Sequence, residues 1–125
     1  WIADNEMPDQ FVLEHLEELQ QTQALLSNEL GNASALAWRL KRPDVALYDT
    51  EGELRYGLQY AGSVHRKVEL EEVQAWLKEQ RRLGSVGVLM RVNSTSEMRE
   101  AGQLPPGGKR YYKGSLELII YSKSP

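Results

Sequence analysis

The residues able to do chemistry in this chain are few, and they form no familiar catalytic or metal-binding pattern. The chain has no cysteine and two histidines, His15 and His65. Without cysteine, disulfides, thiolate metal ligands and a cysteine nucleophile are all excluded. Neither histidine has a partner at a metal-binding spacing such as HxxxH or HExxH. We therefore expect no metal and no cofactor.

Acid–base or nucleophilic chemistry would have to come from isolated groups. His15 lies in a segment rich in glutamate, so we expect an exposed imidazole paired with a neighbouring carboxylate. Ser27 or Ser63 beside His65 and Asp49 would make a serine triad, but the chain lacks a GxSxG motif. The acidic cluster around Asp49 lacks the twelve-residue ligand pattern of an EF-hand, which favours a solvated turn.

The turn SNELGNA, at residues 27–33, is a candidate phosphate site. It follows a short apolar run and precedes a helical pattern, the place where an open α/β sheet binds phosphate. The turn has one glycine and matches neither GxGxxG nor GxxxxGK[ST]. An ordinary strand-to-helix connection is the favoured interpretation.

A basic and aromatic run, KRYYK, offers Lys109, Arg110 and Lys113 as contacts for phosphate-bearing lipid head groups. A lysine or arginine near an anionic bilayer contributes about 1 kcal/mol. From the residues alone, a solvated charged face is the favoured interpretation of the same pattern. A formal net charge of −3 argues against nucleic acid as a partner, because general nucleic-acid binders carry a basic face.

The elements that position these residues are clearest between Leu25 and Asp49. Apolar residues at helical spacing predict a helix over residues 30–40, and Pro43 then ends the helical pattern. Short apolar runs on either side predict two strands. Strands joined by a helix usually pair in parallel with a right-handed crossover.

Two further helices are predicted. One begins at Pro8 and carries an apolar stripe of Val12, Leu16 and Leu19. The other covers residues 70–83 and ends at Gly84, which suits a left-handed cap. The tryptophans of the second and third predicted helices, Trp38 and Trp76, are expected in the core.

The remaining segments complete an α/β pattern. Residues 1–7 are expected to be a loose lead-in, 61–68 a polar loop and 94–102 a short helix. Residues 85–92 predict a strand buried on both faces, and residues 109–122 predict two strands that meet at Gly114. We expect a three-layer α/β/α sandwich with a mostly parallel sheet and an antiparallel C-terminal edge, forming a single soluble domain over residues 1–125.

The chain contains no run approaching the ~18 to 20 apolar residues of a membrane span, and its first residues do not have the form of a signal peptide. It starts abruptly on Trp1 and Ile2, as an excised piece of a longer chain would.

Two stretches, residues 27–60 and 84–100, closely resemble the C-terminal soluble portion of enterobacterial undecaprenyl-phosphate 4-amino-4-deoxy-L-arabinose (aminoarabinose) transferases. The likeness covers most of the chain, from about Phe11 to Tyr121. It implies that the parent is an inner-membrane glycosyltransferase that moves a cationic aminosugar from undecaprenyl phosphate to lipid A and so gives resistance to polymyxin and cationic peptides.

The resemblance also implies a place and partners for this domain. It would lie on the periplasmic side of the inner membrane, against the transmembrane half of the same chain. The catalytic acids of the family lie in that other half, so no catalytic residue is carried over. Lys109, Arg110 and Lys113 gain support as contacts, because lipid A and the undecaprenyl carrier both bear phosphate.

Two alternatives remain open. The domain could be an interaction module that stabilises the membrane half or docks a partner of the lipid A pathway. It could also be a small stand-alone α/β enzyme of unknown substrate, using polar residues that follow the strands. Those residues are few: Ser27, Asn28, Asp49, Asn93 and Ser94.

Overall fold

The structure, a computed structural model, describes residues 8–28, 30–42, 45–49, 66–69, 72–92 and 104–124. The lead-in at 1–7, the turn expected after Asp49 and the helix expected at 94–102 lie outside these residues. The elements, in chain order, are α1 (Pro8–Glu14), α2 (Leu16–Gln20), β1 (Ala24–Ser27), α3 (Leu30–Leu40), β2 (Ala46–Asp49), β3 (Arg66–Glu69), α5 (Val73–Leu83), β4 (Val86–Arg91), β5 (Lys109–Lys113) and β6 (Leu116–Tyr121).

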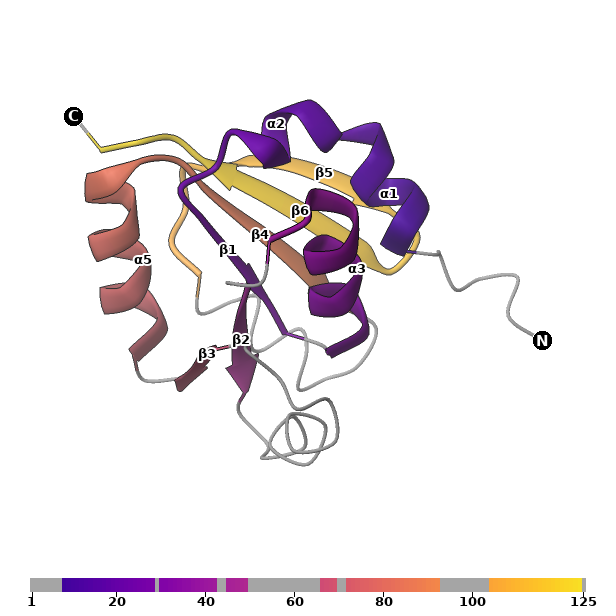
Figure 1. The fold of residues 1–125 in the computed structure, drawn as a ribbon. Coiled ribbons are helices and arrows are strands. Elements are labelled where there is room, and N and C mark those ends of the chain that lie inside the picture. Colours follow the sequence, from indigo (N-terminus) through magenta and orange to yellow (C-terminus); the bar gives the residue numbers. More distant parts are fainter. Residues whose placement is uncertain are drawn as a thin grey trace.

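The strands form one mixed sheet in the order β3-β2-β1-β4-β6-β5 (Figure 1). β3, β2, β1 and β4 run parallel to one another, whereas β6 is antiparallel to both β4 and β5. The predicted α/β class is therefore confirmed, and the β1–α3–β2 unit is present with its strands in parallel. Gly114, at φ 57°, makes the tight turn between β5 and β6.

Both faces of the sheet are covered by helices, because β1 and β4 are apolar on both sides. Along β1, Ala24 and Leu26 belong to one apolar cluster together with Val73 and Leu77 of α5. Leu25 faces the other way, into a cluster with α1, α2 and α3. Figure 1 shows α5 on one side of the sheet and the other three helices on the opposite side.

The prediction of a loop over residues 61–68 is wrong for its last part, which belongs to strand β3. The segment Arg66–Glu69 contains one apolar residue, Val68, which is buried. β3 is an edge strand that pairs in parallel with β2 through its backbone. Main-chain pairing leaves no hydrophobic pattern in the sequence, so a polar edge strand resembles a loop.

The N-terminal helix is interrupted where one continuous helix was expected. α1 ends at Glu14 and α2 begins at Leu16, with His15 between them at φ −122° and ψ 24°. The His15 amide donates to the Val12 carbonyl at 3.1 Å, a bond that tightens the chain before the second helix starts. Val12 and Leu19 nevertheless remain buried, as the apolar stripe predicts.

The prediction that Trp38 lies in the core is wrong, because its side chain is 76% exposed. Ala33, Leu36 and Leu40 form the buried face of α3, and Trp38 lies outside that face. Trp76 is partly buried against the α5 cluster, so for this residue the prediction holds in part.

Gly84 ends α5, but it is not a left-handed cap. Its φ of 176° is extended backbone that any residue can adopt. A Cβ placed on Gly84 would lie 2.6 Å from the Cβ of Gln23, at the point where the Gln23 amide donates to the Ser85 carbonyl at 2.6 Å. Close approach of two backbones, rather than a positive φ, accounts for the glycine.

The left-handed cap occurs instead at the end of α3, on a lysine. Lys41 has a φ of 55°, and the Arg42 amide donates to the Ala37 carbonyl at 3.0 Å. This six-to-one hydrogen bond across a left-handed residue is the Schellman ending, a position at which glycine is strongly favoured. A lysine there stores strain, since its Cβ crowds the backbone.

No helix within the described ranges is long and apolar enough to cross a membrane.

We predict that Lys41→Gly stabilises the domain by roughly 0.5–1 kcal/mol, because glycine adopts a positive φ without steric cost. Urea unfolding monitored by circular dichroism would measure the change. The matched control is Lys41→Ala, which removes the same charge but keeps a Cβ and should change stability little. Equal stabilisation by both substitutions would assign the effect to charge and contradict the prediction.

Candidate functional site

The polar groups at the carboxyl end of β1 are used inside the fold. Ser27 is fully buried and Asn28 is 7% exposed. The Asn28 carboxamide donates from Nδ2 to the Arg91 carbonyl and accepts at Oδ1 from the Arg91 amide, both at 2.9 Å. One side chain thus imitates a main-chain partner and extends the pairing of β1 with β4. Asn28 lies at the switch point between β1 and β4, where an open α/β sheet usually binds a ligand.

The serine triad cannot be assembled from the described part of the chain. Ser27 is buried, Asp49 belongs to β2, and Ser63 and His65 lie outside the described residues. The described ranges also hold no cluster of three or more histidine, cysteine, aspartate or glutamate side chains arranged to bind a metal. Of the polar residues considered for a stand-alone enzyme, Asn93 and Ser94 lie outside the described residues as well.

The basic and aromatic run forms β5, the edge strand of the sheet. Because side chains alternate along a strand, its three cations do not share one face. Lys109 and Lys113 lie with Tyr111 on the side of α1 and α2, and Arg110 lies on the opposite side with Tyr112.

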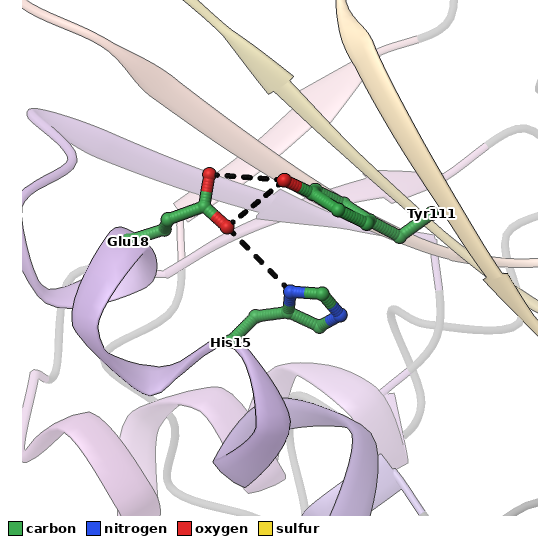
Figure 2. Close-up of polar contacts among 3 residues, drawn as sticks. All are labelled: His15, Glu18 and Tyr111. Carbon is green, nitrogen blue, oxygen red and sulfur yellow. Dashed lines mark hydrogen bonds and ion pairs between the residues drawn. The ribbon is translucent and has the colours of Figure 1, made fainter.

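Tyr111 joins β5 to the N-terminal helices through a carboxylate and an imidazole. Its hydroxyl lies 3.0 and 3.2 Å from the two carboxylate oxygens of Glu18 and donates to them. Glu18 Oε1 also lies 3.6 Å from Nδ1 of His15. Figure 2 shows the Glu18 carboxylate pointing from α2 toward both the Tyr111 hydroxyl and the His15 ring.

The pairing of His15 was predicted correctly, but its exposure was not. Its side chain is 16% exposed because aromatic rings cover it on two sides. Phe11 meets it edge-on at a centroid distance of 5.3 Å, and Tyr111 lies at 4.1 Å. The break between α1 and α2 places the imidazole in this aromatic layer.

The two lysines on this face of β5 both lie at the interface between β5 and the N-terminal helices. Lys113 Nζ lies 2.8 Å from Glu14 Oε2 at the end of α1. Lys109 Nζ lies 5.4 Å from the centre of the Tyr111 ring. The interaction with Tyr111, and after it the negative charge of Glu18, raises the pKa of Lys109. The acidic side of α1 and α2 therefore attracts the basic side of β5.

Arg110 has a partner on the other face. Its Nη1 donates to Glu117 Oε2 of β6 at 2.6 Å, and the Glu117 side chain is 7% exposed whereas that of Arg110 is 32% exposed. The hydrogen bond to Glu117 raises the pKa of Arg110. A carboxylate this deeply buried needs a cationic partner, so Arg110 contributes to folding whatever else it does.

The partners of the predicted cations were missed at the sequence level. Glu14 and Glu18 precede β5 by about a hundred residues, and the only signal for them was the acidic side of the first helix. Glu117 offered a better signal, since a hairpin around Gly114 brings it near Arg110.

Comparison with known proteins places this chain in a family. The model of the family described as "Arabinosyl transferase ArnT, C-terminal domain" matches residues 3–120. The chain belongs to the ArnT C-terminal domain family. The resemblance found in the sequence is thereby confirmed at the level of the family.

Similar proteins carry a consistent name. An undecaprenyl phosphate-alpha-4-amino-4-deoxy-L-arabinose arabinosyl transferase 2 from Pseudomonas fluorescens Pf-5 is 59% identical over 124 residues, which are 99% of this chain and 21% of that protein. Transferase 1 of the same strain is 54% identical over 98% of this chain and 22% of its own length. The transferase of Pseudomonas aeruginosa LESB58 is 52% identical, with coverages of 95% and 22%.

The chain spans about a fifth of the length of these ArnT relatives. No solved structure gives a significant match.

Removing the hydroxyl of Tyr111 should loosen the contact between β5 and the N-terminal helices. We predict that Tyr111→Phe lowers the free energy of unfolding by about 1 kcal/mol, because the Glu18 carboxylate loses a hydrogen bond. Tyr112→Phe is the matched control: it removes the same atom from the neighbouring residue, which is 66% exposed. Similar losses in the two variants in urea unfolding would contradict the assigned contact.

Breaking the Arg110–Glu117 pair should cost more than removing both charges. We predict that Arg110→Ser destabilises the domain by about 2 kcal/mol, because it leaves a buried carboxylate without a cation. Adding Glu117→Gln should recover at least half of that loss. A double-mutant cycle of thermal unfolding would measure the coupling, and strictly additive losses would show that the pair does not act as a unit.

Proposed function

We propose that residues 1–125 form the C-terminal domain, on the periplasmic side, of an inner-membrane transferase for 4-amino-4-deoxy-L-arabinose. The observation that carries this proposal is the family match over residues 3–120, together with relatives about five times longer that share one transferase name. The transmembrane half of the same chain would be the immediate partner of this domain.

The proposed reaction of the whole protein moves the aminosugar from undecaprenyl phosphate to phosphate groups of lipid A. The transferred sugar carries an amine, which is positively charged at neutral pH. Each addition therefore offsets negative charge on the outer membrane. Coulomb attraction for polymyxin and other cationic peptides falls as a result, which gives resistance.

Within that protein we propose a non-catalytic role for this domain. Ser27 and Asn28, the polar residues at the switch point of the sheet, are taken up by packing and by the bond to Arg91. The cover of helices on both sheet faces supports a three-layer α/β/α sandwich, a rigid body suited to holding a surface in place. Catalysis would reside in the transmembrane half.

The surface proposed to contact lipid phosphate is the edge strand β5, through Lys109, Arg110 and Lys113. Lys109 is exposed, and Arg110 has guanidinium donors beyond the one bonded to Glu117. Lysine and arginine suit phosphate oxygens through charge-assisted hydrogen bonds. A purely structural reading competes with this one, because cations on an edge strand also prevent unwanted strand pairing.

The test replaces Lys109, Arg110 and Lys113 with serine in the full-length transferase, with Glu14→Gln and Glu117→Gln added so that no carboxylate loses its cation. Contact with lipid phosphate predicts reduced aminoarabinose on lipid A, measured by mass spectrometry, and a several-fold loss of polymyxin resistance. Immunoblots of the membrane fraction would establish equal protein levels.

Glu14→Gln with Glu117→Gln alone is the first control, and Lys78→Ser with Lys123→Ser removes cations elsewhere. Both controls should retain transfer. Unchanged transfer and resistance in the serine variant would remove β5 as a lipid contact. If deletion of the whole domain still abolished transfer in that case, the domain would be an interaction module of the enzyme.

A further inference from the structure

The most exposed large apolar side chain among the described residues is an indole. Trp38 is 76% exposed, and it follows Ser34 by one helical turn on the outer side of α3. An indole has roughly 150–250 Å² of largely apolar surface, so its exposure to water is unfavourable in free energy. Folding does not account for an indole at this position. Ala33, Leu36 and Leu40 already supply the buried face of α3.

Trp38 stands in a basic setting. A hollow of about 290 Å³ lies beside it, and its lining within the described residues consists of Ala37, Trp38, Arg39 and Lys41. Two of these residues are cations and none is a carboxylate. We call Trp38, Arg39 and Lys41 the Trp38 surface. It is locally positive on a chain whose formal net charge is −3.

Lys41 occupies a left-handed position at a helix end, where glycine is the favoured residue. Its φ of 55° is left-handed, and the Schellman bond from Arg42 to Ala37 depends on that conformation. Strained backbone on a residue with a Cβ points to a function for the side chain when the surrounding fold does not need it. Here the strain places an ammonium group next to an exposed indole.

The neighbouring arginine fixes this surface in place. Arg42 donates from Nη1 to the Thr22 carbonyl at 2.7 Å and from Nη2 to the Gln23 carbonyl at 3.1 Å. These bonds tie the end of α3 to the start of β1. The Trp38 surface is therefore presented by a rigid corner of the fold.

A second exposed apolar residue lies near the end of the helix that covers the other face of the sheet. α3 and α5 each lead into a parallel strand, so both end at the amino-terminal edge of the parallel strands. Figure 1 shows both helices ending toward the top of the view. Leu83, the last residue of α5, is 52% exposed. Trp38 and Leu83 thus belong to the last turns of two helices that cover opposite faces of the sheet and end toward the same edge.

We propose that the Trp38 surface docks on the anionic phosphate head groups of a phospholipid bilayer. Tryptophan with nearby arginine and lysine is the combination that anchors proteins at the membrane interface. The common edge with Leu83 fits an extended surface better than a single small ligand. The proposal rests on the proposed function only for the presence of a membrane next to the domain.

A protein partner, such as the transmembrane half, is the main competitor. Tryptophan and arginine are also enriched at protein interfaces, but lysine is depleted there. The strained Lys41 beside the indole therefore favours lipid. This contact uses residues of α3, whereas the contact proposed for β5 uses Lys109, Arg110 and Lys113. The two proposals are therefore distinct.

The test uses the 125-residue chain with Trp1→Phe and Trp76→Phe, so that Trp38 is the only fluorophore. Vesicles of phosphatidylglycerol and phosphatidylethanolamine should shift its emission to the blue and carry the chain down on sedimentation. Pure phosphatidylcholine vesicles should do neither. Arg39→Gln and Lys41→Gln should each weaken binding roughly fivefold, in keeping with the contribution of one cation at an anionic surface.

Lys41→Gly gives the sharpest result, because it should raise stability while it weakens vesicle binding. Lys78→Gln, on an exposed residue of α5 at the opposite face of the sheet, is the control and should bind normally. Absence of a blue shift on anionic vesicles, or binding insensitive to the Arg39 and Lys41 substitutions, would overturn the inference. Loss of binding only when Lys109, Arg110 and Lys113 are replaced would also overturn it and leave the β5 proposal standing.

Discussion

The architecture of this domain depends on two central strands, β1 and β4, that are apolar on both faces. β1 and β4 are buried along nearly their whole length and pair in parallel at the centre of the sheet. Parallel neighbours cannot be joined by a tight turn, so helices must cross over and cover the sheet. α3 covers one face and α5 the other, and their crossovers bring both helix ends to one edge. The exposed corner at Trp38 is a consequence of that arrangement.

The parts of the fold that could be predicted are those with a hydrophobic period. The β1–α3–β2 unit, β4 and the β5–β6 hairpin all follow from apolar spacing and from Pro43 and Gly114. β3 was missed because an edge strand needs only backbone pairing. The end of α3 at Leu40 was predicted, but the left-handed conformation of Lys41 was not, because it has no sequence signal. The exposure of Trp38 was missed since periodicity treats an indole as core.

The candidate site was foreseen as a set of residues but not as an arrangement. Lys109, Arg110 and Lys113 stand close together in the sequence, and strand alternation then separates them onto two faces. Arg110 finds its carboxylate, Glu117, in the same hairpin. Glu14 and Glu18, which contact Lys113 and Tyr111, come from the other end of the chain, and a single sequence cannot reveal that pairing. Charge therefore contributes to the tertiary structure here. The contacts of Glu14 and Glu18 hold the first helices against the β5–β6 hairpin.

The position of β5 at the edge of the described sheet has a further consequence if many copies of the domain share one membrane. Confinement to two dimensions raises the local concentration of edges far above its value in solution. An unpaired strand in such a layer is a template for lateral growth of sheets from molecule to molecule. Like charges on Lys109 and Arg110 repel the same charges of an approaching copy. Charge at this edge would thereby disfavour the joining of sheets between neighbouring copies of the domain.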